Sequence, residues 1–138
     1  MNQNSATPSR RRVVITGVGL VSPLGIGTAE TWDGLIQGRC GIGPITHFDT
    51  SDYVSRIAGE VKGFDPLSVL EKKEIKKADR FIHFALAASR FAIEDARLVI
   101  DESNGERTGV NIGSGIGGLP SIVSPVRLKM RPSPTSPT

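Results

Sequence analysis

Residues 11–25 read RRVVITGVGLVSPLG, and this stretch decides the fold of the chain. The β-branched run at residues 12–16 predicts a buried strand. Gly17 and Gly19 follow it, and Pro23 and Gly25 end the stretch. Glycine after a strand lets the backbone turn tightly or approach a neighbouring element closely. We therefore expect an α/β fold whose first strand runs into a close-packed turn.

A second strand is predicted at residues 108–112, again directly before a glycine loop, GSGIGG at residues 113–118. Gly113, Gly115 and Gly118 fit the pattern G-x-G-x-x-G of dinucleotide sites. Such a site also needs a helix after the loop and an acidic residue at the end of the next strand. Proline-rich sequence follows the loop, so we predict no helix there and keep nucleotide binding as the least favoured function.

Two helices are predicted between these strands. Thr28 is the expected cap of a helix at residues 29–37, and a longer helix is predicted at residues 79–98. The glycine- and proline-punctuated residues 39–66 predict a loop with one short strand at residues 57–61. The long helix has an apolar stripe of alanine and phenylalanine, and its predicted polar edge consists of His83, Arg90, Glu94 and Arg97.

The length of 138 residues suits one domain, with a disordered arm expected at residues 1–10 and a disordered Pro/Ser/Thr-rich tail at residues 123–138. The net charge of +3 comes from the two ends, since residues 13–122 carry more acids than bases. A basic face on the folded body is therefore missing, and we expect no nucleic-acid partner. Nor do we expect a membrane span or a secretory signal. We expect a cytoplasmic protein, with a short organellar transit peptide as the alternative.

The single cysteine excludes an internal disulfide and suits a reducing compartment. Cys40 lies in a glycine turn upstream of the long helix, with no helix N-terminus to activate its thiol. We therefore expect an unreactive loop cysteine. His47 and His83 are expected to be plain surface residues, and we expect no metal and no cofactor.

Four blocks of sequence occur in the order found in one enzyme family: residues 11–25, Gly41-Ile42 with Phe48-Asp49, residues 72–81 and residues 113–118. Over about residues 11–122 the chain resembles the β-ketoacyl-acyl-carrier-protein synthases of the elongating, type II branch. The resemblance implies the N-terminal part of a thiolase-like layered α/β/α/β/α fold, incomplete in this chain. It also implies an enzyme that is usually a homodimer.

Members of this family elongate fatty acids by decarboxylative condensation of an enzyme-held acyl group with malonyl-carrier protein. The resemblance implies a nucleophilic cysteine at a helix N-terminus, two histidines and a supporting lysine. All four lie downstream of the matching part, and Cys40, His47 and His83 match none of them. We therefore assign no catalytic residue and expect the chain alone to be inactive.

Two binding roles can be carried over from the family. Ile116 matches the isoleucine that gates the acyl channel in the family's Gly-Ile-Gly-Gly loop. Lys73, Lys76 and Lys77 match the basic patch that docks the acidic acyl carrier protein. Their spacing predicts one face of a helix, where they would attract an acidic partner.

The leading hypothesis is an N-terminal piece of a condensing enzyme, truncated or frame-shifted near residue 122. The alternative is a non-catalytic module that retains the lysines to bind carrier protein. In either case the two predicted strands would lack neighbours. We therefore expect the isolated chain to be poorly packed, with exposed sheet edges.

Overall fold

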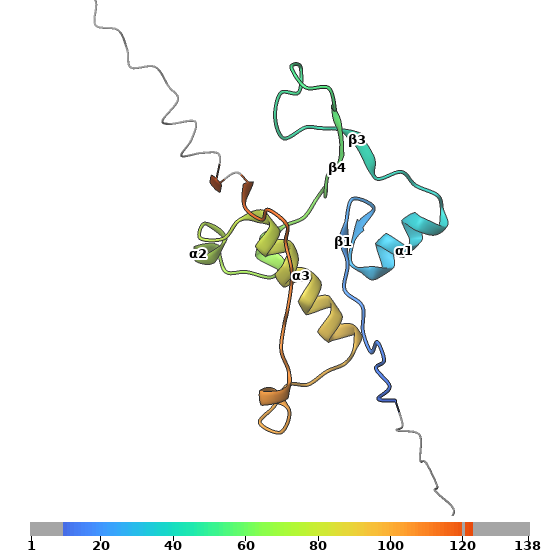
Figure 1. The fold of residues 1–138 in the computed structure, drawn as a ribbon, viewed down its shortest axis with the longest axis vertical. Coiled ribbons are helices and arrows are strands. Elements are labelled where there is room, and N and C mark those ends of the chain that lie inside the picture. The colour runs from blue at the N-terminus through green and yellow to red at the C-terminus, as the bar shows by residue number, and fades with distance from the viewer. Residues whose placement is uncertain (1–9, 120, 123–138) are drawn as a thin grey trace, which may run out of the picture.

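The computed structural model describes residues 10–119, 121 and 122. The expected tail at residues 123–138, and the expected arm apart from Arg10, lie outside the described residues. Within the described part the chain forms two small hairpins, two helices of 9 and 16 residues and several short helical turns (Figure 1). The predicted α/β class is confirmed, although long stretches are extended without pairing. No helix in the described ranges is long and apolar enough to cross a membrane.

The first hairpin and its helix are built by contacts between sequence neighbours. β1 (Val21–Ser22) pairs antiparallel with β2 (Gly25–Ile26), and α1 (Thr28–Ile36) follows at once. The helix predicted at residues 29–37 is thus confirmed to within one residue at each end. Strand and helix pack together here because the connection between them is too short to allow anything else.

The predicted helix cap is wrong. Gly27 holds the N-cap position with a φ of 95°, a left-handed conformation that glycine adopts without strain. The Thr28 hydroxyl donates instead to Val18 O at 2.7 Å. Glu30 Oε2 accepts a hydrogen bond from Ile26 N at 2.9 Å, which connects the first turn of α1 to the end of β2. A carboxylate in the first turn also suits the positive end of the helix dipole.

The second hairpin joins β3 (Ile42–Pro44) to β4 (Ile57–Gly59), antiparallel and in register from Ile42↔Gly59 to Pro44↔Ile57. The short strand predicted at residues 57–61 is confirmed over its first three residues. Its partner lies in a segment predicted to be loop. Glycine and proline make up two of the three residues of β3, and they are poor strand formers except on an edge. Pairing with β4 overrides that preference.

The central helix, α3 (Arg80–Asp95), confirms the body of the helix predicted at residues 79–98. It ends earlier than expected because Arg97 adopts a left-handed φ of 51°. The N–H groups of Arg97 and Leu98 then donate to carbonyls in the last turn of the helix. This is the Schellman arrangement, with arginine in the position usually held by glycine.

The segment before α3 packs along its surface. Arg80 Nη2 donates to Val61 O at 2.8 Å, and Arg90 Nη1 donates to Ser68 O at 3.0 Å. Between them the Phe64 and Phe84 rings meet edge to face, with centroids 5.1 Å apart. This segment also contains a 3₁₀ turn at Pro66–Ser68 and α2 (Lys72–Ile75), a single turn of helix. A second 3₁₀ turn, at Gly105–Arg107, follows α3.

His83 is not the surface residue that the sequence predicts. It is only 7% exposed, and its Nε2 has no hydrogen-bond partner in the described part of the chain. His83 shares a face with the fully buried Ala87, four residues later, so the contact surface of α3 extends over both. Of the rest of the predicted polar edge, Arg90 and Glu94 form an exposed ion pair, with Arg90 Nε 2.7 Å from Glu94 Oε1, whereas Arg97 lies beyond the end of α3.

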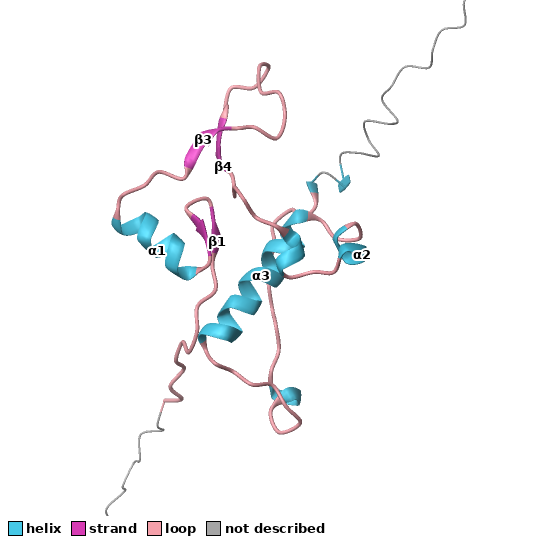
Figure 2. Ribbon diagram, turned by 180° about the vertical axis from the view of Figure 1, so that it is seen from behind, coloured by secondary structure: helices cyan, strands magenta, loops and turns pink. Residues whose placement is uncertain are grey.

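The predictions of a buried strand at residues 12–16 and of a second strand at residues 108–112 are wrong. Residues 12–16 and 108–112 are extended but belong to neither of the two-stranded sheets. Val13 is 89% exposed and Ile15 is 85% exposed. Both segments are drawn as loop, on opposite sides of α3, in Figure 2. A β-branched run favours a strand only where a neighbouring strand is present to pair with it.

The glycines after the first extended segment do make the predicted close approach. A Cβ on Gly17 would meet Ala96 N at 2.6 Å, and one on Gly19 would meet Ala92 N at 2.5 Å. Val18 between them donates its N–H to Asp95 Oδ2 at 2.8 Å. Glycine facing alanine allows the two backbones to lie against each other.

The hydrophobic core is small. Among the described residues, Ala87 is the one buried hydrophobic side chain, with Thr31 and His83 as buried polar ones. Many large apolar side chains stay exposed, among them Val110 at 70% and Ile112 at 51%. The expectation of exposed, unpaired segments thus agrees with the structure, which contains local elements without a closed core.

Candidate functional site

The lysine segment, residues 72–77, is shorter as a helix than predicted. α2 ends at Ile75, Lys76 is its C-cap with φ −72° and ψ −16°, and Lys77 N donates to Glu74 O at 2.9 Å in the following turn. One turn of helix is marginal on its own. Lys73, Lys76 and Lys77 therefore share a helical turn and its continuation rather than the face of a longer helix.

The charge of the lysine segment is open to solvent. Lys73 Nζ lies 2.8 Å from Glu71 Oε2, with both side chains 71% exposed. Lys76 and Lys77 are exposed as well, and neither forms an ion pair within the described part of the chain. Residues 71–77 contain four lysines against two glutamates. The segment therefore presents net positive charge to an approaching partner.

The glycine loop, residues 113–118, is open at its start and closely packed at its end. A Cβ on Gly113 or Gly115 would meet nothing within 4 Å. Gly117 has a φ of 70°, and a Cβ there would lie 3.1 Å from the Phe81 ring. The Ile116 side chain is 70% exposed. Because Phe81 belongs to the first turn of α3, the loop and the lysine segment meet the same end of that helix.

The prediction that no helix follows the glycine loop is wrong. Leu119, Ser121 and Ile122 have helical conformation, and Ile122 N donates to Gly118 O at 3.1 Å. This helical turn restores only one requirement of a dinucleotide site, since residues 108–112 form no ladder strand before the loop.

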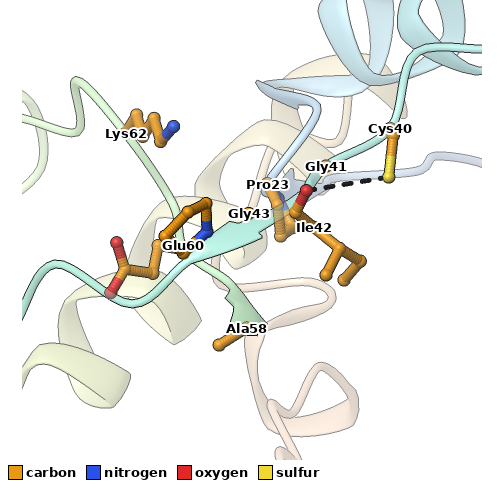
Figure 3. Close-up of a pocket in the computed structure, with 9 residues that line it drawn as sticks. Pro23, Cys40, Gly41, Ile42, Gly43, Ala58, Glu60 and Lys62 are labelled. Carbon is orange, nitrogen blue, oxygen red and sulfur yellow. Dashed lines mark hydrogen bonds between the residues drawn. The ribbon is translucent and has the colours of Figure 1, made fainter. Parts of the chain in front are cut away.

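Cys40 behaves as predicted, as an exposed loop thiol. Its Sγ donates a weak hydrogen bond to Ile42 O at 3.7 Å, drawn as a dashed line in Figure 3. The cavity beside it has a volume of about 70 Å³. Ligand sites usually enclose at least about 300 Å³, so this hollow is too small for an acyl chain.

Glu60, just after β4, lines the same cavity (Figure 3), and its carboxylate accepts hydrogen bonds from Thr46, just after β3. Its pKa is lowered, first by the hydrogen bond from Thr46 N at 2.8 Å and then by that from Thr46 Oγ1 at 2.7 Å. His47 is exposed as predicted, and its Nε2 lies 3.8 Å from Glu60 Oε1. The described residues contain no cluster of three or more histidine, cysteine, aspartate or glutamate side chains that could hold a metal ion.

Comparison with known families gives a match over most of the chain. The family described as "Beta-ketoacyl synthase, N-terminal domain" matches residues 10–135. This chain belongs to the β-ketoacyl synthase family. The match includes the lysine segment and the glycine loop, so both candidate sites are part of the N-terminal domain that β-ketoacyl synthases share.

Individual β-ketoacyl synthases are similar to the chain at high identity. The 3-oxoacyl-[acyl-carrier-protein] synthase 2 of Synechocystis sp. is 54% identical over 114 residues, which cover 83% of this chain and 27% of that protein. The enzyme of the same name from Coxiella burnetii is 52% identical over 113 residues, covering 82% and 27% respectively. The chain thus spans about a quarter of the length of these relatives.

A solved structure confirms the fold. The ishigamide ketosynthase/chain length factor matches with a TM-score of 0.73 and 32% sequence identity, over 88% of this chain and 30% of that one. The predicted ketosynthase, thiolase-like fold is therefore shown, as the partial α/β unit described above. Neither the dinucleotide-binding alternative nor the stand-alone binding module is favoured by these likenesses.

One contact at these sites was missed by the sequence analysis. Asp79 lies between the lysine segment and α3, and its side chain reaches Ser121 just beyond the glycine loop. The available signal was an aspartate at the first position of the helix predicted at residues 79–98, which indicates a cap. Nothing in the pattern relates that residue to one more than forty positions later.

Proposed function

We propose that the chain is the N-terminal segment, residues 11–122, of a β-ketoacyl-acyl-carrier-protein synthase. The whole enzyme would elongate fatty acids by condensing an enzyme-held acyl group with malonyl-carrier protein, with loss of carbon dioxide. Family membership and the named activity of the relatives support this reaction. We further propose a cytoplasmic homodimer for the whole enzyme, without metal or cofactor.

The part of this function assigned to the described residues is carrier docking. The observation behind it is the exposed, unneutralised charge of Lys76 and Lys77, beside Lys73. An acidic partner would be attracted over a distance of about 10 Å at moderate salt, and the contact would weaken as salt rises. Binding through an exposed patch of this kind agrees with a brief encounter that delivers and releases substrate.

Ile116 is the proposed contact with the acyl chain. Its side chain is 70% exposed, on a loop whose first glycines have no close neighbours. An apolar side chain held out from a glycine loop is suited to form part of the wall of an apolar channel. The loop reaches the same end of α3 as the lysine segment, which would put the delivered chain near the docking site.

The isolated chain is proposed to lack condensing activity. Acyl transfer through a thiol needs an activated thiolate, and Cys40 is an exposed loop thiol whose hydrogen bond goes to a backbone carbonyl. Incubation with acyl- and malonyl-carrier protein should give no β-ketoacyl product above a blank. Any product above the blank would contradict the proposal. The variant Cys40→Ser would then show whether that product depends on the Cys40 thiol.

Docking is tested by titrating the chain with acidic acyl carrier protein at low and at moderate salt. The variant Lys76→Glu, Lys77→Glu should lose binding, because two attractions become repulsions. A matched control, Lys62→Glu with Arg107→Glu, makes the same change in net charge at two exposed positions outside the lysine segment. Equal loss in both variants would indicate general charge attraction, and unchanged binding in the first would remove the lysine segment from the site.

A further inference from the structure

Asp79 has the position of a helix cap but does not serve as one. It is the N-cap residue of α3, with the extended backbone usual there, φ −70° and ψ 159°. Aspartate at this position normally accepts a hydrogen bond from an N–H in the first turn. Here the side chain makes no such bond. Its Oδ1 accepts instead from Ser121 Oγ at 2.6 Å, across 42 residues of sequence.

The glycine loop is shaped to fit against this carboxylate. A Cβ built on Gly118 would overlap Asp79 Oδ2, so any larger residue would displace the side chain. One residue earlier, Gly117 lies against the Phe81 ring and needs its left-handed φ of 70°. Three neighbouring positions of the segment, 117, 118 and 121, thus contact the first residues of α3. Two of these contacts involve the Asp79 carboxylate, and the third involves the Phe81 ring in the first turn of α3.

We propose that Asp79 is a positioning residue, which holds the end of the glycine loop and thereby places Ile116 at the start of α3. The inference rests on the proposed function only where it treats Ile116 as a wall of the acyl channel. Among the described residues, a Cβ on Gly113 or Gly115 would meet nothing within 4 Å, whereas Gly117 and Gly118 pack against Phe81 and Asp79. The position of Ile116 then depends on the contact of Gly117 with Phe81 and on the contacts of Gly118 and Ser121 with Asp79.

Asp79 also follows Lys77 by two residues, so it stands between the two proposed binding sites. A carrier protein bound to the lysine segment would restrict the backbone just before this residue. Because the Asp79 carboxylate contacts Ser121 and Gly118, that restriction would also reduce the motion of the loop. Docking and the channel wall would thus be connected by a path of a few residues.

The test is amide hydrogen exchange in this chain, followed by NMR without carrier protein. The reporters are Leu119 N–H and Ile122 N–H, which donate to Gly117 O and Gly118 O. Asp79→Ala and Ser121→Ala should each speed their exchange about threefold to tenfold, the effect of losing one hydrogen bond to a charged group at an exposed site. The double variant should add little, because both changes remove the same contact.

Two further variants separate positioning from a general role in the helix. Asp79→Asn keeps an oxygen that accepts from Ser121 and should restore most of the slow exchange. Asp95→Ala is the matched control at the other end of α3, where Asp95 Oδ2 accepts from Val18 N at 2.8 Å. It should speed exchange at Val18 and leave the two reporters unchanged.

Equal exchange of the reporters in the unmodified chain and in both single variants overturns the proposal, whether that exchange is slow or as fast as in a free peptide. Acceleration by Asp79→Ala without acceleration by Ser121→Ala also overturns it, because Asp79 would then act on its own helix only. Carrier titration remains a separate readout. Loss of positioning with intact docking, or the reverse, shows which of the two proposals has failed.

Discussion

Two regions of this molecule differ in how far their hydrogen bonds reach. The first, residues 21–59, contains two hairpins and α1, and its polar groups find partners nearby in the sequence. The second consists of residues 10–20 and 108–114, the two extended segments beside α3, which form no ladder within the described part of the chain. The hairpins need only their own neighbours. The extended segments have strand-forming sequences but no strand to pair with.

The contrast teaches that strand propensity and strand formation are separate matters. In the second hairpin Ile42 pairs with Gly59 and Ile57 pairs with Pro44, even though glycine and proline are poor strand formers. Val13 and Ile15, in a far better strand sequence, remain 89% and 85% exposed. A β-branched side chain gains stability from packing against a neighbouring strand, and that neighbour must come from elsewhere.

The largest expected effect of this difference is on association. Val13→Ser with Ile15→Ser should raise several-fold the concentration at which the chain stays monodisperse, measured by light scattering. Both side chains lie on an unpaired extended segment, which is a template for pairing between molecules. Val54→Ser with Leu67→Ser is the control, because these exposed residues are isolated in separate turns. Similar gains in both variants would show that exposed apolar area alone drives association.

A smaller effect is expected where an extended segment is held by α3. A valine at Gly19 would overlap the backbone of Ala88 and Ala92, at a cost of about 1–3 kcal/mol for overpacking. Gly19→Val should therefore release the segment, seen as fast amide exchange at Val18. In Gly43→Val, where a Cβ meets nothing within 4 Å, exchange at Val18 should not change. Slow exchange in both variants would mean that the close approach to α3 does not hold the segment.

The smallest expected effect is a pH dependence confined to the second hairpin. The pKa of Glu60 lies below its ordinary value of 4.5, chiefly because Thr46 donates two hydrogen bonds to the carboxylate. A lowered pKa in the folded state contributes stability that is complete above 4.5 and is lost as pH falls through the folded value. Thr46 N–H exchange, compared with its intrinsic rate, should therefore lose protection on acidification below pH 4.5.

Glu60→Gln provides the control for this titration. The amide keeps an oxygen acceptor but cannot titrate, so the pH dependence at Thr46 should vanish. Asp49 and Asp101 also have lowered pKa values, caused by hydrogen bonds from Ser51 and Ser103, and they will titrate in the same variant. A pH dependence at Thr46 that persists in Glu60→Gln would therefore assign it to another group.

Local features of the fold were predictable because their causes are local. The apolar repeat from Phe81 onward indicates α3, and the stretch between Gly27 and Gly38 indicates α1. The C-terminal end of α3 was not predictable, because Arg97 adopts a left-handed conformation that is uncommon for residues other than glycine. The candidate site residues Lys73, Lys76, Lys77 and Ile116 came from family resemblance, and their roles stay predictions.

By itself the sequence determined the family, the two main helices and the glycines that allow backbone contact with α3, because each depends on residue type at short range. Only the tertiary structure decided that β3 is a strand, that His83 is buried and that Asp79 reaches Ser121 rather than its own helix. It also decided that residues 12–16 and 108–112 pair with no strand among the described residues. The physical reason is the same in each case. Burial and pairing depend on which distant segments are present to make the contact, and residue preference alone carries no information about them.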